Sequence, residues 1–179
     1  MKRLDLFDQE AFQQQLGQYP ALPVFKQTLQ AGQSLLAEAF FAKEPVLELV
    51  QQHTWLIDQL LIQAWEYFDL DKKLDACLIA TGGYGRGELH PYSDIDLLIL
   101  TKQSLSAADE QALAEFMRLL WDMRLRVGHS VRDLADTLQA CREDSLMMTS
   151  LLETRLLDGN EDLYAEAREA LHPDKLWDA

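Results

Sequence analysis

The sequence predicts an α+β fold, in which helices pack on a small mixed β-sheet. Helical periodicity dominates the first third of the chain, apolar strand-like segments follow at residues 74–80 and 94–100, and helical periodicity then returns. Helices on either side of a group of strands predict one small sheet with the helices packed against it. We therefore expect an N-terminal helical segment at residues 1–70 and a core with C-terminal helices at residues 71–179, joined as one structural unit.

The N-terminal segment predicts two long helices. Residues 1–20 are polar and rich in glutamine, and predict a short helix or a loose arm. In residues 22–42 and again in residues 45–68, apolar side chains recur every three or four positions, which is the period of a helix with one buried face. These two helices are expected to form an antiparallel pair, followed by a polar loop at residues 69–73.

The core is expected to begin with two strands on either side of a glycine-rich turn. Residues 74–80 predict the first strand and residues 81–87 the turn. The second strand, residues 94–100, is continuously apolar after its start, which indicates burial on both faces. Residues 106–120 predict a helix whose first residue, a serine, serves as the N-cap. Polar and apolar residues alternate over residues 122–127, which predicts a third strand.

Three more helices are expected in the last third of the chain, at residues 131–141, 144–157 and 161–171. A turn at residues 158–160 separates the last two. Its glycine, Gly159, suits the position that follows the end of a helix.

The composition excludes several classes of function. The chain has 179 residues with 16 Lys and Arg against 30 Asp and Glu, a net charge of −14, and it has no basic stripe of the kind that binds duplex nucleic acid or an anionic membrane. It shows no signal peptide and no run of apolar residues long enough to span a membrane, so we expect a cytoplasmic protein. Cys77 and Cys141 do not have the spacing of metal ligands and are expected to be buried thiols.

A pair of carboxylates at the start of the second strand predicts a metal site. Asp94 and Asp96 are two positions apart on a strand, so their side chains point to the same face, about 6.5–7 Å apart. Two such carboxylates repel each other, and a bound cation removes the repulsion. Mg²⁺ prefers oxygen ligands and often combines one or two carboxylates with the phosphates of a substrate.

The glycine-rich turn before this pair predicts phosphate binding. Gly82 and Gly83 allow a phosphate to approach the backbone closely. Arg86 offers a forked cation that suits phosphate, and the hydroxyl of Ser93 can donate a hydrogen bond to a phosphate oxygen. The turn matches neither the P-loop pattern nor the dinucleotide-binding fingerprint. The combination of turn and carboxylates is typical of phosphoryl or nucleotidyl transfer, in which positioning and electrostatics supply most of the catalysis.

The same residues carry a family resemblance. Gly82-Gly83 followed by Asp94-Ile95-Asp96 resembles the signature of the DNA-polymerase-β-type nucleotidyltransferase superfamily. More narrowly, the string from Gly82 to Asp96 resembles the N-terminal nucleotidyltransferase domain of the bifunctional uridylyltransferase/uridylyl-removing enzymes of bacterial nitrogen regulation. Residues 128–132 and 156–159 are similar to the same family.

The resemblance implies a sheet of the nucleotidyltransferase type and a Mg²⁺-dependent enzyme, with Mn²⁺ as an alternative cation. It implies that this enzyme transfers UMP from UTP to a tyrosine of the PII signalling protein. Asp94 and Asp96 then match the metal carboxylates, and Gly82 and Gly83 match the nucleotide-phosphate turn. The family pattern includes a third acidic residue, for which Asp122 is our candidate; relatives can carry an acid where this chain has Arg126.

Two alternatives remain open from the sequence. The first is a regulatory module that binds a nucleotide with little or no turnover, which Arg126 favours. The second is an adenylyl- or other nucleotidyltransferase with a different acceptor. The resemblance implies that whole members of the family also carry a metal-dependent hydrolase domain with a His-Asp dipeptide, and this chain has no such dipeptide. It is therefore expected to be an excised domain or a stand-alone relative, without the uridylyl-removing activity.

Overall fold

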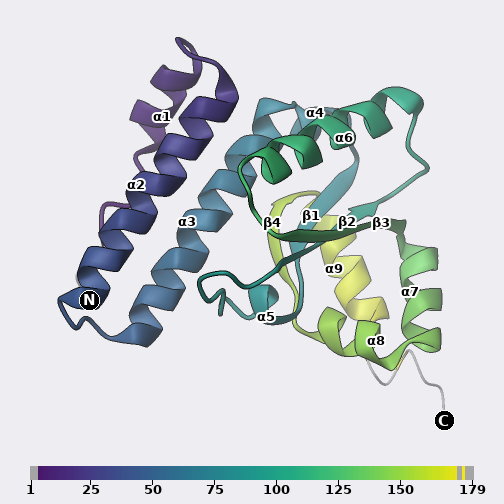
Figure 1. Cartoon of the computed structure of the whole chain (residues 1–179). Coiled ribbons are helices and arrows are strands. Elements are labelled where there is room, and N and C mark those ends of the chain that lie inside the picture. Colours follow the sequence, from purple (N-terminus) through teal and green to yellow (C-terminus); the bar gives the residue numbers. More distant parts are fainter. Residues whose placement is uncertain (1–3, 173–174, 176–179) are drawn as a thin grey trace.

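The computed structural model describes residues 4–172 and residue 175, and shows a four-stranded sheet with helices on both faces (Figure 1). In chain order the elements are α1 (Gln9–Leu16), α2 (Ala21–Phe41), α3 (Val46–Tyr67), α4 (Leu70–Lys73), β1 (Ala76–Ala80), α5 (Gly82–Gly85), β2 (Ile95–Thr101), α6 (Ala107–Asp122), β3 (Val127–Asp133), α7 (Leu134–Glu143), α8 (Ser145–Leu152), β4 (Arg155–Gly159) and α9 (Glu161–Ala170).

The sheet is mixed, as the sequence predicts. Its strand order is β3-β2-β1-β4, with β1 antiparallel to both β2 and β4, and β2 parallel to β3. The two central strands are buried along their length except at Asp96. The predicted α+β class is therefore confirmed, and the burial of β2 on both faces agrees with its continuous apolar sequence.

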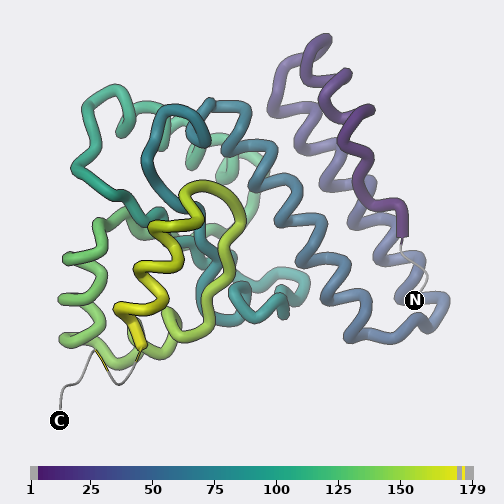
Figure 2. The backbone as a smooth tube through the Cα atoms, turned by 180° about the vertical axis from the view of Figure 1, so that it is seen from behind, coloured from purple at the N-terminus to yellow at the C-terminus, as the bar shows by residue number. Residues whose placement is uncertain are grey.

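Each face of the sheet packs against its own group of helices. Leu78 and Ile99 point to one face, where they join a core cluster with residues of α2, α3 and α6. Ile79 and Leu98 point to the other face and join a second cluster with residues of α7, α8 and α9. The reversed view in Figure 2 shows the N-terminal helices on the far side of the molecule from α7, α8 and α9. This division follows from the alternation of side chains along a strand.

The N-terminal helices confirm the predicted pair. α2 and α3 pack side by side, and the turn between them passes through Lys43, which has a left-handed φ of 66°. At Gly32 the helices approach closely, because a Cβ on this residue would lie 2.5 Å from a methyl carbon of Leu56. In Figure 1 α3 lies between the sheet and the outer helices α1 and α2. Within the described residues, no helix is long and apolar enough to cross a membrane.

Two predicted segments around α6 had different outcomes. The helix predicted at residues 106–120 is confirmed as α6, and Ser106 and Asp109 form a reciprocal capping box at its start. The strand predicted at residues 122–127 is wrong. Asp122 ends α6, and Arg124 adopts a left-handed φ of 64°, so β3 begins only at Val127. The polar–apolar alternation there reflects the end of a helix and the turn that follows it.

Other boundaries also differ from the prediction. The polar loop expected at residues 69–73 contains the short helix α4, which the fully buried Leu70 anchors to the core. Residues 131–133 complete β3, and Asp133 then caps α7 through the N–H of Asp136. The helix expected at residues 144–157 ends at Leu152 and gives way to β4.

The position of Gly159 explains why β4 escaped prediction. This glycine ends the strand with a φ of 107°, and a Cβ on it would lie 2.2 Å from the carbonyl oxygen of Ala76 in β1. The glycine therefore allows two strands to approach each other closely, and it does not follow the end of a helix as predicted. Its partner lies far away in the sequence, so no local pattern identifies this role.

Candidate functional site

The two predicted carboxylates lie at the start of β2. Asp94 immediately precedes the strand, and Asp96 is its second residue and the one exposed position in an otherwise buried strand. Partial desolvation raises the pKa of the Asp96 carboxyl, and the negative charge of Asp94 raises it further. The two charges therefore act on each other, as expected of neighbours on one side of a strand, and a cation between them would relieve the repulsion.

Glycines keep space free on both sides of the Asp96 carboxylate. A Cβ on Gly82 would lie 3.9 Å from Oδ2 of Asp96 and 3.3 Å from Oγ of Ser150, and Gly82 has a left-handed φ of 57°. A Cβ on Gly128 would lie 3.0 Å from Oδ1 of Asp96. A side chain at Gly128 would crowd the carboxylate and one at Gly82 would contact it, so their absence leaves room for a ligand beside it.

The glycine-rich turn forms α5 and is held from behind by a buried polar network. The Tyr84 hydroxyl donates a hydrogen bond of 2.6 Å to Oδ1 of Asp58 in α3. Arg155 in β4 donates to both carboxylate oxygens of Asp58, at 2.7 and 3.1 Å. Burial raises the pKa of Tyr84 well above its usual value, and the charge of Asp58 raises it further. The network ties α3, α5 and β4 together, so the turn is held rigidly next to the carboxylates.

The parallel pairing of β2 with β3 places an arginine beside the carboxylates. Asp96 pairs with Gly128, and one step earlier the N–H of Ile95 donates to the carbonyl oxygen of Arg126. Nε of Arg126 lies 3.1 Å from Oδ1 of Asp94, and its Nη1 donates at 2.9 Å to the carbonyl oxygen of Tyr92. The side chain next to Asp94, directly before the neighbouring strand, is thus a cation.

The candidate third ligand lies elsewhere. Asp122 is the last residue of α6 and is exposed to solvent. In the part of the chain that the structure describes, no third His, Cys, Asp or Glu completes a metal-binding group with Asp94 and Asp96. Asp94 and Asp96 therefore lie together at the start of β2, whereas Asp122 forms no metal-binding group with them among the described residues.

The two predicted phosphate contacts, Arg86 and Ser93, differ in their surroundings. Arg86 is exposed and forms ion pairs with Glu88, at 2.9 Å, and with Glu153. These hydrogen bonds raise the pKa of Arg86, and they direct its guanidinium towards glutamates. Ser93 is exposed directly before Asp94, and its N–H donates to the carbonyl oxygen of His90. Its hydroxyl remains close to the carboxylates, while the charge of Arg86 is already compensated.

A cavity that the sequence does not reveal adjoins Asp96. It has a volume of about 360 Å³ and lies between the sheet and α8, and we call it the Asp96 cavity. Ser130 and Arg132 of β3 and Ser150 of α8 line it. Nε of Arg132 is buried and has no hydrogen-bond partner among the described residues. The alternation along β3 would have identified Ser130 and Arg132 if the strand had been placed correctly, whereas no local signal marks Ser150.

Comparison with known proteins agrees with this geometry. Residues 61–135 match the model of the Nucleotidyltransferase domain family. The chain is 39% identical over 178 residues to the bifunctional uridylyltransferase/uridylyl-removing enzyme of Azotobacter vinelandii, which covers 97% of the chain and 19% of the relative. It is 38% identical over 175 residues to the enzyme of Stutzerimonas stutzeri, with the same coverage, and 40% identical over 152 residues to that of Photobacterium profundum, covering 85% of the chain and 17% of the relative.

The chain spans about a fifth of the length of these relatives, and the similarity to the Azotobacter and Stutzerimonas enzymes covers nearly all of it. The matched family segment contains the glycine turn, both carboxylates and all of β3. The chain therefore belongs to the nucleotidyltransferase family, and over nearly its whole length it is similar to one part of the bifunctional uridylyltransferase/uridylyl-removing enzymes.

Proposed function

We propose that this nucleotidyltransferase transfers UMP from UTP to a protein hydroxyl, the tyrosine of a PII-type signalling protein, as part of nitrogen regulation. The observation that carries the proposal is the Asp94–Asp96 pair with glycines on both sides of the Asp96 carboxylate. The relatives named above are uridylyltransferases, which supports UTP as the donor. A protein acceptor is consistent with a site that lies at the surface of the chain, where a second protein can reach it.

Asp94 and Asp96 are the residues that would hold a divalent cation. Two carboxylate groups and the phosphates of a substrate form a ligand set that Mg²⁺ accepts, with Mn²⁺ as an alternative. The space beside Asp96 fits such an ion, because neither Gly82 nor Gly128 places a side chain there. When bound, the cation neutralises the pyrophosphate leaving group and lowers the pKa of the attacking hydroxyl.

The nucleotide is proposed to lie along the Asp96 cavity. Gly82 and Gly83 let the phosphates approach the backbone, and the hydroxyls of Ser130 and Ser150 can donate hydrogen bonds. Arg132 supplies a cation whose buried Nε has no partner among the described residues. The side chain as a whole is half-buried, and its unpaired N–H favours a ligand that can accept a hydrogen bond, such as a phosphate oxygen. We therefore assign to Arg132 the phosphate contact that the sequence suggested for Arg86.

One observation favours a second candidate function. Arg126, directly before β3, pairs with Asp94 at 3.1 Å and occupies the position at which the family resemblance implies that relatives can carry an acid. A cation there competes with a metal ion for Asp94. A module that binds a nucleotide and regulates a partner, with little turnover, would have this arrangement.

Binding and turnover separate these functions. Calorimetry with UTP, CTP and ATP, with and without Mg²⁺, should show Mg²⁺-dependent binding of UTP that Asp94→Asn combined with Asp96→Asn abolishes. Incubation with UTP and a PII-type protein should then release pyrophosphate and add UMP to a tyrosine. UTP binding without pyrophosphate release would support the regulatory module, and a preference for ATP would support adenylyl transfer. Absence of nucleotide binding under every condition would refute the proposal for this chain.

A further inference from the structure

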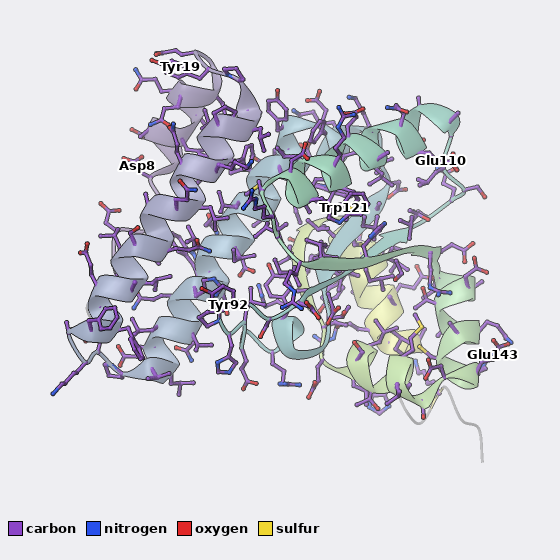
Figure 3. The ribbon with its side chains drawn as sticks, viewed as in Figure 1. Asp8, Tyr19, Tyr92, Glu110, Trp121 and Glu143 are labelled. Carbon is purple, nitrogen blue, oxygen red and sulfur yellow. The ribbon has the colours of Figure 1, made fainter. Side chains whose placement is uncertain are left out.

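A second cavity adjoins the carboxylates from the side of the N-terminal helices. It has a volume of about 520 Å³ and shares no lining residue with the Asp96 cavity. Residues of α2 and α3 form one wall, and residues 92, 93, 95 and 123–126 form the other. We call it the Arg126 cavity, after the arginine that contacts Asp94. Figure 3 shows Tyr92, one of its lining residues, in the loop that connects α5 to β2.

The charge of this cavity is opposite to that of the chain. Lys26, Arg124 and Arg126 line it, and no Asp or Glu is among the described residues that do so. The whole chain carries 30 acidic against 16 basic residues, so three cations without an acid are unlike its average surface. In the part of the chain that the structure describes, Lys26 and Arg124 form no ion pair. Two cations are therefore available to an anionic ligand.

The backbone of the cavity wall is strained at two residues. Tyr92 has a φ of 67° and Arg124 a φ of 64°, a left-handed conformation that residues other than glycine rarely adopt. Arg126 joins these two segments, because it follows Arg124 and donates a hydrogen bond to the carbonyl oxygen of Tyr92. Such residues are often retained where a ligand is held. Strain in both segments thus points to the same cavity as the charges do.

We propose that the Arg126 cavity binds an acidic segment of the protein acceptor and presents the neighbouring hydroxyl to Asp94. This inference rests on the proposed nucleotidyl transfer. An in-line displacement requires the attacking group and the leaving group on opposite sides of the reacting phosphorus. With the nucleotide in the Asp96 cavity, the acceptor must approach from another side, and the Arg126 cavity opens beside Asp94 through Ser93 and Arg126.

The test uses a fluorescently labelled peptide, Glu-Glu-Tyr-Glu-Glu, and its neutral analogue, Gln-Gln-Tyr-Gln-Gln. Fluorescence anisotropy measures their affinity for the full chain at low and at high salt. We expect the acidic peptide to bind more tightly than the neutral one, and the difference to shrink at high salt. Lys26→Gln and Arg124→Gly should each weaken the binding of the acidic peptide about three- to fivefold. Glycine adopts the φ of Arg124 without strain, so this variant keeps the fold.

Arg142→Gln is the matched control, since it removes an exposed positive charge from α7 on the other face of the sheet. The inference is refuted if neither peptide binds, if both bind equally, or if Lys26→Gln binds the acidic peptide as tightly as Arg142→Gln does. A loss of UTP affinity in Lys26→Gln would assign the cavity to the nucleotide and refute it as well. Failure of the proposed function is a separate result, namely no UTP binding by the unaltered chain.

Discussion

A methyl group at residue 128 should displace the Asp96 carboxylate. A Cβ on Gly128 lies 3.0 Å from Oδ1 of Asp96, whereas relaxed contacts between carbon and oxygen lie at about 3.3–3.6 Å. In Gly128→Ala the carboxylate must therefore move by a few tenths of an ångström. Because a displacement of about 1 Å in a catalytic site costs on the order of 100-fold in rate, we expect a loss of about tenfold.

The stability of this variant should not fall. Gly128 is not one of the glycines with a positive φ, so alanine adopts its backbone without strain. Replacement of a strand glycine reduces the entropy of the unfolded chain, which predicts an unchanged free energy of unfolding or a gain of about 0.5 kcal/mol. Urea unfolding measures this quantity, and calorimetry with Mn²⁺ and UTP measures the affinity of the site.

Gly17→Ala serves as the control, because its added Cβ lies 3.5 Å from the nearest oxygen, an ordinary contact far from the carboxylates. The expected pattern is a weaker metal–nucleotide affinity and a slower release of pyrophosphate in Gly128→Ala alone. If Gly128→Ala and Gly17→Ala match each other in both quantities, the space beside Asp96 has no role in binding, and the reasoning from the glycines is refuted.

Three further predictions concern stability and metal binding. Asp58→Asn should lower the free energy of unfolding by about 2 kcal/mol, because it leaves a partly buried Arg155 without its counter-charge. Urea unfolding tests this, with Asp71→Asn as the control variant. Burial lowers the pKa of His53, so the unfolded chain binds more protons below pH about 6.5 and the free energy of unfolding should fall as the pH drops through that value. His53→Asn should lose this part of the pH dependence in thermal melts at about pH 7.5 and 5.5, and an equal slope in both proteins would contradict it. Arg126→Gln should tighten Mn²⁺ binding about threefold by releasing Asp94, and an unchanged affinity would show that the ion pair does not compete with the metal.

The fold was predicted best where local periodicity is strong. The helices at α2, α3, α6 and α9 and the strands β1 and β2 all lie within two or three residues of the predicted segments. The helix predicted at residues 131–141 is also found, as α7. The strand predictions failed between residues 122 and 159, where β3 was placed too early and β4 was missed, on opposite edges of the sheet. An edge strand such as β3 is only partly buried, so its apolar pattern is weak, and its start depends on the left-handed turn at Arg124.

The error in β3 also limited prediction of the site. Asp94, Asp96 and the two glycines of the turn lie in one continuous segment, and the structure brings Gly82 next to Asp96 as the pattern predicts. Gly128 and Arg132, which reach the site from β3, were not predicted to line it, and the contact between Arg126, directly before β3, and Asp94 was not predicted either. Their place depends on the register between β2 and β3, and a parallel pair is joined by a long crossover that leaves no local signal.

The sequence by itself determined the fold class, the carboxylate pair and the glycine turn, because each depends on residues that are close together in the chain. Only the tertiary structure decided that Arg126 faces Asp94, that Asp122 ends a helix and forms no metal-binding group with the two carboxylates among the described residues, and that Arg86 is paired with glutamates. These outcomes depend on strand register and on contacts between distant segments. The same packing places residues of α2 across the cationic cavity from Ser93 and Arg126, the neighbours of Asp94.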